Sequence, residues 1–145
     1  MDLREQFYGT EIGMTGITRE HAAEVVAQMF GTSIYYNDSY SSWRLLDPEG
    51  KEWKFVYDSS ISPQRRTGGR LFSAGTEYCT EMVSPKLAYE EMGKLQEVVR
   101  CLRKNGARVN PSCGMHVHVA ASIHTPRILK IALTIFYSKE DILFK

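Results

Sequence analysis

The chain has 145 residues, of which 43% are hydrophobic and 24% charged, and its formal net charge is +1. A chain of this length buries one hydrophobic core and is too short for two, so we expect a single domain over residues 1–145. The near-neutral charge excludes a general electrostatic attraction to nucleic acid or to an anionic membrane surface. We therefore expect no direct nucleic-acid binding and no membrane association.

The N-terminal residues and the cysteines predict a cytoplasmic protein. Residues 1–6 (MDLREQ) lack the basic start and the apolar run of a signal peptide, and no segment has the uninterrupted apolar length of a membrane helix. Cys79, Cys101 and Cys113 are odd in number and lack C-x-x-C spacing, which disfavours a disulfide framework and suits a reducing compartment. We expect free thiols.

The first elements are a strand and a helix. Alternation over residues 7–13 predicts a strand in which Glu11 and Gly13 share one face. Apolar residues at spacings of three and four then predict an amphipathic helix that begins after an N-cap at Thr18 and ends at Gly31. This helix should pack on a sheet.

Two β-rich stretches, residues 33–43 and 52–57, are joined by turn-forming residues 47–50 and predict a hairpin. Its aromatic residues suit hairpin packing better than a base-stacking platform, because no basic residues interleave with them. Residues 76–84 predict a further strand with Glu77, Cys79 and Glu81 on one face. An apolar stripe over residues 86–104 predicts a second long helix on the same sheet face as the first.

Residues 62–74 form a polar segment that allows two interpretations. It contains Arg65, Arg66 and Arg70 around two glycines. One interpretation is a solvated, mobile hairpin tip. The other is a contact with a phosphate group or with the acidic surface of a partner, since guanidinium groups beside glycines can approach an oxyanion closely.

The C-terminal region predicts a helix from about 127 to 137, with Thr125 and Pro126 in the N-cap and first-turn positions. This helix is apolar almost all round, so it should be buried both by its own domain and by something else, either a protein partner or a second copy of the chain. Ser138 and Asp141 predict the start of a fourth helix, inside which the sequence ends.

Residues 112–119 (SCGMHVHV) predict a strand in which His116 and His118 stand side by side on one face. Met115, Val117 and Val119 occupy the other face, which we expect in the core. Two imidazoles one strand period apart make half of a metal site, although either ring could instead face water or accept another hydrogen-bond partner.

Three motifs occur in order along the chain: residues 8–12 (YGTEI), 81–85 (EMVSP) and 114–119 (GMHVHV). Together with residues 14–19 and 58–60 they resemble the amidoligase family, relatives of glutamine synthetase and glutamate–cysteine ligase that join a carboxylate to an amine with ATP. The resemblance spans nearly the whole chain and corresponds to the N-terminal half of the longer family members.

The resemblance implies an α+β fold, a curved antiparallel sheet with about three helices packed on one face, as in a truncated glutamine synthetase-like catalytic sheet. The other face would hold divalent ions. Carried over by position, Glu11, Glu81 and His116 would be metal ligands, with His118 beside them. Carboxylates and imidazole suit this reaction, in which metal ions neutralise nucleotide phosphates.

Two departures from the family pattern affect the expected chemistry. Gly13 occupies the position at which the family usually has a second acid, and the family's second half, with its nucleotide-binding arginines, does not follow. Two histidines with one or two carboxylates suit zinc, whereas magnesium prefers oxygen ligands and ATP phosphates. We expect zinc, with magnesium and ATP as the alternative.

These observations leave three hypotheses. In the first, the chain is a catalytically degenerate, zinc-supported amidoligase-like module that binds another protein, for example as a phage- or mobile-element-encoded inhibitor of a host defence nuclease. In the second, it is a working ATP-dependent carboxylate–amine ligase, completed by dimerisation or by a separately encoded second half. In the third, no metal binds, and the histidines hydrogen-bond to Glu11 and Glu81, which raises the pKa of the histidines and lowers that of the acids.

Overall fold

The computed structural model describes residues 3–121 and 124–143, which form an α+β fold around a six-stranded antiparallel sheet with strand order β2-β3-β4-β7-β1-β8. The predicted fold class is confirmed. The strands are β1 (Tyr8–Met14), β2 (Ile34–Asn37), β3 (Ser42–Leu46), β4 (Glu52–Tyr57), β5 (Gln64–Thr67), β6 (Arg70–Ser73), β7 (Thr80–Val83) and β8 (Met115–Val119). The helices are α1 (Arg19–Phe30), α2 (Met92–Lys104), α3 (Pro126–Ser138) and α4 (Glu140–Leu143), with 3-10 turns η1 (Leu3–Glu5), η2 (Ser39–Ser41), η3 (Thr76–Tyr78) and η4 (Tyr89–Glu91).

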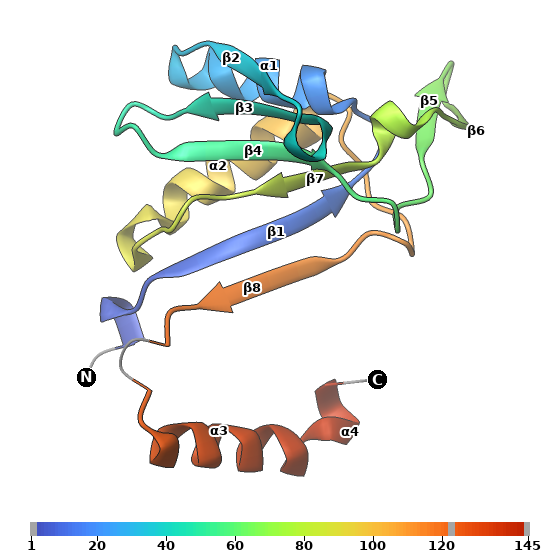
Figure 1. Ribbon diagram of the computed structural model, residues 1–145. Helices are drawn as coiled ribbons and strands as arrows, with labels where there is room; N and C mark the ends of the chain where they lie inside the picture. Colours follow the sequence, from blue (N-terminus) through green and yellow to red (C-terminus); the bar gives the residue numbers. More distant parts are fainter. Residues whose placement is uncertain (1–2, 122–123, 144–145) are drawn as a thin grey trace.

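The core lies between one face of the sheet and the two helices α1 and α2, as Figure 1 shows. Leu45, Trp53, Phe55 and Met82 project from β3, β4 and β7 into this layer and are fully buried. Helix α1 contacts β3, β4 and α2. Among the described residues, none of the α-helices lies over the opposite face of the sheet in Figure 1, so most of that face is open apart from the short turn η2.

The predicted caps of α1 are confirmed. Thr18 has extended backbone, and its hydroxyl accepts a hydrogen bond from the backbone N–H of His21 at 3.2 Å. Gly31 ends the helix in the left-handed conformation with φ 71°, which a glycine adopts without steric cost. Helix α2 ends at Lys104, as expected, with Asn105 as its C-cap.

Two predicted strands are shorter in the structure than the sequence indicates. The stretch 33–43 is interrupted by η2, because the Asn37 side chain accepts a hydrogen bond from the Ser39 N–H and turns the chain. The stretch 76–84 begins as the helical turn η3, in which the Cys79 N–H donates to Thr76, so Glu77 does not lie on the strand. Cys79 is buried instead, with its Sγ 3.2 Å from the carbonyl oxygen of Ile61.

Helix α2 begins later than predicted. Leu87 forms an antiparallel bridge with Tyr8, with N–H to oxygen distances of 2.8 and 2.9 Å, so residues 86–88 are held against the sheet before the helix starts. The turn η4 then leads into Met92, the first residue of α2.

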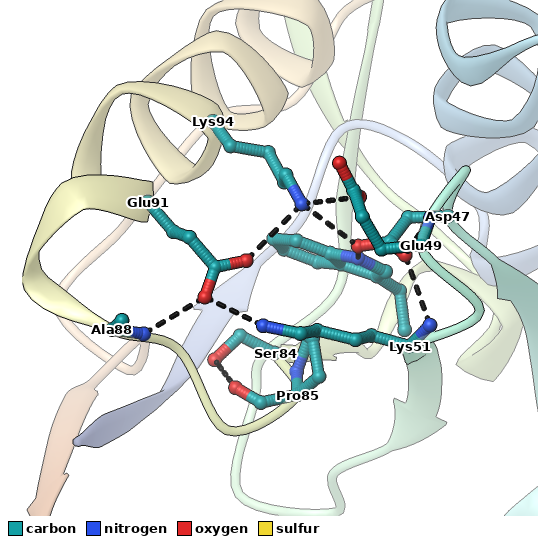
Figure 2. A network of polar contacts seen from close by, with 9 residues as sticks. Asp47, Glu49, Lys51, Ser84, Pro85, Ala88, Glu91 and Lys94 are labelled. Carbon is teal, nitrogen blue, oxygen red and sulfur yellow. Dashed lines mark hydrogen bonds and ion pairs between the residues drawn. The ribbon is translucent and has the colours of Figure 1, made fainter.

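A network of charged residues joins the β3–β4 turn to the start of α2 (Figure 2). The Asp47 side chain is fully buried and accepts hydrogen bonds from the Trp53 indole and from Lys94. Lys94 also contacts Glu91 at 3.2 Å, and Lys51 contacts Glu91 at 2.5 Å. Burial alone would raise the pKa of Glu91, but the Ala88 N–H and the two ammonium groups lower it to about 2.

The prediction that the apolar face of β8 is buried is wrong. Met115, Val117 and Val119 are 61%, 55% and 50% exposed, because β8 is the edge strand and neither α1 nor α2 covers it. Helix α3 has the predicted Thr125 cap but no buried residue, and Figure 1 shows it beyond the edge of the sheet. The expected third helix is therefore present without packing on the sheet face.

Three further predictions concern the state of the cysteines, the presence of a membrane-spanning helix and the structure at the ends of the chain. Cys79, Cys101 and Cys113 are free, as predicted. Within residues 3–121 and 124–143, no helix combines the length and the apolar character needed to cross a bilayer. The predicted fourth helix is α4, and residues 144–145 of that prediction lie outside the described residues, as do residues 1–2 of the N-terminal stretch.

Candidate metal centre

Three neighbouring strands bring Glu11, Glu81 and His116 together on the open face of the sheet. Glu11 lies directly opposite His116 in the β1–β8 ladder, and Glu81 lies opposite Gly13 in the β1–β7 ladder. Residues directly opposite each other share a face, which places all three side chains on one side. Ligand atoms of Glu11, Glu81 and His116 lie within 4.8 Å of one another, a spacing at which one ion can contact all three.

The two histidines of β8 flank the Glu11 carboxylate. His116 Nδ1 is 3.1 Å from one Glu11 oxygen, and His118 Nε2 is 3.2 Å from the other. The hydrogen bond from His116 is the main reason that the pKa of Glu11 is lowered, with a smaller contribution from His118. His118 is therefore placed to hold Glu11 in position, and it lies outside the group of three whose ligand atoms converge.

Glu81 is the unusual member of the group. Its side chain is half-buried, and it forms no hydrogen bond or ion pair with any residue in the part of the chain that the structure describes. Burial and the neighbouring carboxylates of Glu11 and Asp58 raise its pKa. A half-buried carboxylate beside two others is unfavourable unless a cation or a proton neutralises it.

The donor set fits a divalent metal ion. Two carboxylates and one imidazole offer three protein ligands and leave positions open on an exposed face, which is typical of sites that also bind a substrate or water. The hypothesis that no metal binds and that the histidines hydrogen-bond to the acids explains the contacts of Glu11, which both histidines approach. It leaves Glu81 without a partner among the described residues.

The space beside Gly13 is closed. A Cβ atom built at this position would lie 3.2 Å from the Gly114 nitrogen, 3.3 Å from the Gly114 oxygen and 3.4 Å from Ile61 Cδ1. The Gly13 N–H donates to the Gly114 carbonyl at 2.9 Å, which holds the two backbones together. The second acid of the family pattern is therefore absent, and its space is occupied by backbone.

The cluster of Glu11, Glu81 and His116 lies at one end of a groove of about 840 Å³ that crosses the open face. Arg44 and Lys54 line the groove and occupy the same cross-strand row as Glu11 and His116, connected through Val83. Asp58 and Ser60 line it from the loop after β4. The groove therefore combines a carboxylate cluster with two cationic side chains a few strands away.

Sequence reasoning identified some of these residues and missed others. The four predicted site residues Glu11, Glu81, His116 and His118 share the open face, because strand alternation fixes which side each faces. Asp58, Arg44 and Lys54 were missed as site residues. Asp58 falls in the segment 58–60 that contributes to the resemblance, which could have identified it, whereas Arg44 and Lys54 become neighbours of the cluster only through long-range pairing.

The arginines of residues 62–74 lie elsewhere. This segment forms the hairpin β5–β6, with Gly68 and Gly69 at its turn. Arg65 and Arg66 line a separate pocket, and Arg70 lines neither that pocket nor the groove of the metal centre. The structure therefore does not bring these arginines to the metal centre.

The chain matches the profile of the family described as "Putative amidoligase enzyme" over residues 4–145. The chain belongs to the amidoligase family. The recognition made from the three sequence motifs is thereby confirmed. A search of curated proteins and a search of solved structures found no significant match. In this amidoligase, the three motifs coincide with or directly adjoin the strands β1, β7 and β8 that carry Glu11, Glu81 and His116.

Proposed function

We propose that this amidoligase domain holds one divalent metal ion through Glu11, Glu81 and His116 and takes part in the ATP-dependent joining of a carboxylate to an amine. The observation that carries the proposal is Glu81, a half-buried carboxylate without a partner among the described residues, beside Glu11 and Asp58 on an open face. A cation held between these groups relieves their repulsion, which is the physical reason for a metal at this point.

When bound, a divalent ion supplies positive charge that neutralises nucleotide phosphates and the negative charge that develops during acyl transfer. The chain's own residues bind and orient. His118 contacts Glu11 and keeps its carboxylate turned toward the cluster. Arg44 and Lys54 supply positive charge at the far side of the groove, where a phosphate or a substrate carboxylate is attracted.

Glu52 holds these two cations in the groove. Its carboxylate lies 3.4 Å from Arg44 and 3.4 Å from Lys54, and it accepts a hydrogen bond from the Tyr35 hydroxyl at 2.5 Å. Because these interactions are partly exposed, an incoming anion competes with Glu52 for the cations at modest cost. Arg44 and Lys54 are therefore suited to reversible binding of an anionic substrate.

The donor set also bears on the choice of metal. Two carboxylates and an imidazole favour zinc over magnesium when no nucleotide is present, because magnesium binds imidazole poorly and needs more oxygen ligands. ATP supplies such oxygens. We therefore propose tight binding of zinc by the protein alone and binding of magnesium only together with ATP.

The test is a turnover assay with ATP, magnesium or zinc, a panel of amino-acid carboxylates and a panel of amines. The proposal expects release of ADP or AMP that depends on the amine and is lost in Glu81→Gln. The matched control is His21→Ala, because His21 also contacts a glutamate, Glu24, but lies on α1 away from the groove. Metal-loaded protein that gives no amine-dependent release under these conditions contradicts the ligase function.

A second candidate is the catalytically degenerate module that binds another protein, and two observations favour it. The closed space at Gly13 removes the second acid of the family pattern, and the helix-side face of β8 with α3 exposes a large apolar surface. No described feature names a target, so the inhibitor role stays a prediction. A titration of the zinc-loaded protein with ATP separates the two candidates, because only the ligase has to bind nucleotide.

A further inference from the structure

The β5–β6 hairpin forms one wall of a second pocket, and its base is fixed to the end of β1. The Gln64 N–H donates to Thr15 Oγ1 at 2.8 Å, and the Gln64 carbonyl accepts from the Thr15 hydroxyl at 3.0 Å and from the Gly16 N–H at 2.9 Å. Thr15 is almost fully buried. These bonds hold the wall in place without any ligand.

The segment after α2 forms the opposite wall. Thr15 and Arg108 exchange two backbone hydrogen bonds of 2.8 Å, and Gly16 and Gly106 both have positive φ, 80° and 106°. A Cβ atom on Gly16 would lie 2.5 Å from the Gly106 oxygen, so only glycine permits this approach. The pocket is therefore built into the fold at the point where β1 ends.

The charged residues that line this pocket are all positive. Arg65, Arg66 and Arg108 line its volume of about 370 Å³, and no described aspartate or glutamate lines it. The guanidinium groups of Arg65 and Arg66 form no hydrogen bond or ion pair with any other described residue, although both residues pair through their backbones in the β5–β6 ladder. Arg108 donates through Nη1 to the carbonyl oxygens of Arg103 and Ala107, at 3.0 and 2.6 Å, which fixes its guanidinium at the wall.

We propose that this pocket binds a small anion that carries a phosphate group, of about the size of a diphosphate. Guanidinium groups match phosphate oxygens with paired hydrogen bonds, and the glycine backbone allows close approach of the anion. The pocket volume lies in the range of small-ligand sites, which favours a small molecule over a polymer. The lining shares no residue with that of the groove at the metal centre, so the proposal does not depend on the proposed function.

The probe is inorganic pyrophosphate, titrated calorimetrically into the full chain in EDTA, so that a metal at Glu11 and Glu81 contributes nothing. The test variant is Arg66→Gln, and the matched control is Arg70→Gln, which removes the same charge from the same hairpin outside the pocket. We expect binding by the wild type, a loss of affinity of about tenfold or more in Arg66→Gln, and less than about twofold in Arg70→Gln.

A titration with ADP identifies the source of the phosphate group, and a second variant checks that the loss of affinity does not come from unfolding. ADP that binds more tightly than pyrophosphate, with the same loss in Arg66→Gln, assigns the pocket to a nucleotide, and equal affinity assigns it to the phosphate groups alone. Arg65→Gln is the second variant, and both arginines are exposed, so thermal unfolding should be unchanged. No binding by the wild type, equal losses in Arg66→Gln and Arg70→Gln, or tighter binding of an RNA oligomer that also depends on Arg66 would overturn the proposal.

Discussion

Gly13 lies directly opposite Glu81 in the ladder between β1 and β7, and the backbone of Gly114 fills the space that a side chain at Gly13 would need. The carboxylate of Glu81 therefore faces a glycine where the family pattern places a second acid. The close approach of Gly114 to Gly13 makes the local packing testable by substitution.

Gly13→Ala should lower the free energy of unfolding by about 1–3 kcal/mol, because its Cβ would lie 3.2–3.4 Å from Gly114 and Ile61. The matched control is Gly9→Ala on the same strand and the same face, where the nearest atoms are 3.9 Å away. Urea unfolding of the two variants measures the difference. Equal stability of both variants would show that the chain at Gly114 moves aside readily.

Arg19 connects several segments beside the groove. Its guanidinium donates to the carbonyl oxygens of Ser41, Thr76 and Cys79 at 3.2, 2.6 and 3.0 Å and lies over the ring of Tyr57. Arg19→Lys keeps the charge but loses the forked geometry, so we expect unfolding to become easier by about 1–3 kcal/mol.

The control for Arg19 is Arg100→Lys, because Arg100 makes one hydrogen bond, to Gln96, on the exposed side of α2. Thermal unfolding should be nearly unchanged in this variant. A loss in Arg100→Lys as large as that in Arg19→Lys would mean that the bonds of Arg19 contribute nothing specific.

The charged network at the start of α2 predicts a pH dependence. The pKa of Glu91 is held at about 2, below its ordinary value of 4.5, so its ionised form favours the folded state. This stabilisation, on the order of 3 kcal/mol, is fully present above pH 4.5 and is lost as the pH falls from 4.5 toward 2. Glu91→Gln should lower stability at pH 7 and flatten the acid limb of the stability curve. Glu90→Gln at the exposed neighbouring position should leave that limb as it is.

The exposed face of β8 should tolerate substitutions with little change in the free energy of unfolding. Val117 is 55% exposed, so Val117→Thr should change the free energy of unfolding by less than about 0.5 kcal/mol. Leu45 on β3 is fully buried, and Leu45→Ala should cost about 2–5 kcal/mol. A large loss in the purified Val117 variant would reveal that this face is covered in solution, by α3 or by a second copy of the chain.

Local chemistry made most of the elements predictable. Thr18 and Gly31 mark the two ends of α1, because their capping bonds are made within the same few residues. Strand alternation predicted which side of its own strand each of Glu11 and His116 faces, and the two side chains lie on the same face of the sheet. The motif at Glu81 added the third candidate ligand through the family resemblance. Those signals require no knowledge of distant contacts.

The shortened strands arise from local turns at Asn37 and Thr76, whereas the errors about burial and about the lining of the groove originate in long-range contacts. Alternating Met115, Val117 and Val119 indicate an apolar face, yet the pattern cannot tell whether another element covers it, and β8 lies at the sheet edge. Similarly, Arg44 and Lys54 join the groove only through pairing of β3, β4 and β7. Their role in the site could not be read from neighbouring residues.

The most direct test of the proposed metal centre is a calorimetric titration of zinc into metal-free protein, followed by elemental analysis. We predict about one ion per chain, a loss of affinity of at least about tenfold in Glu81→Gln, and no change in His21→Ala. Magnesium should bind only when ATP is also present. No zinc binding, or the same affinity in Glu81→Gln as in the wild type, would contradict the proposed metal centre.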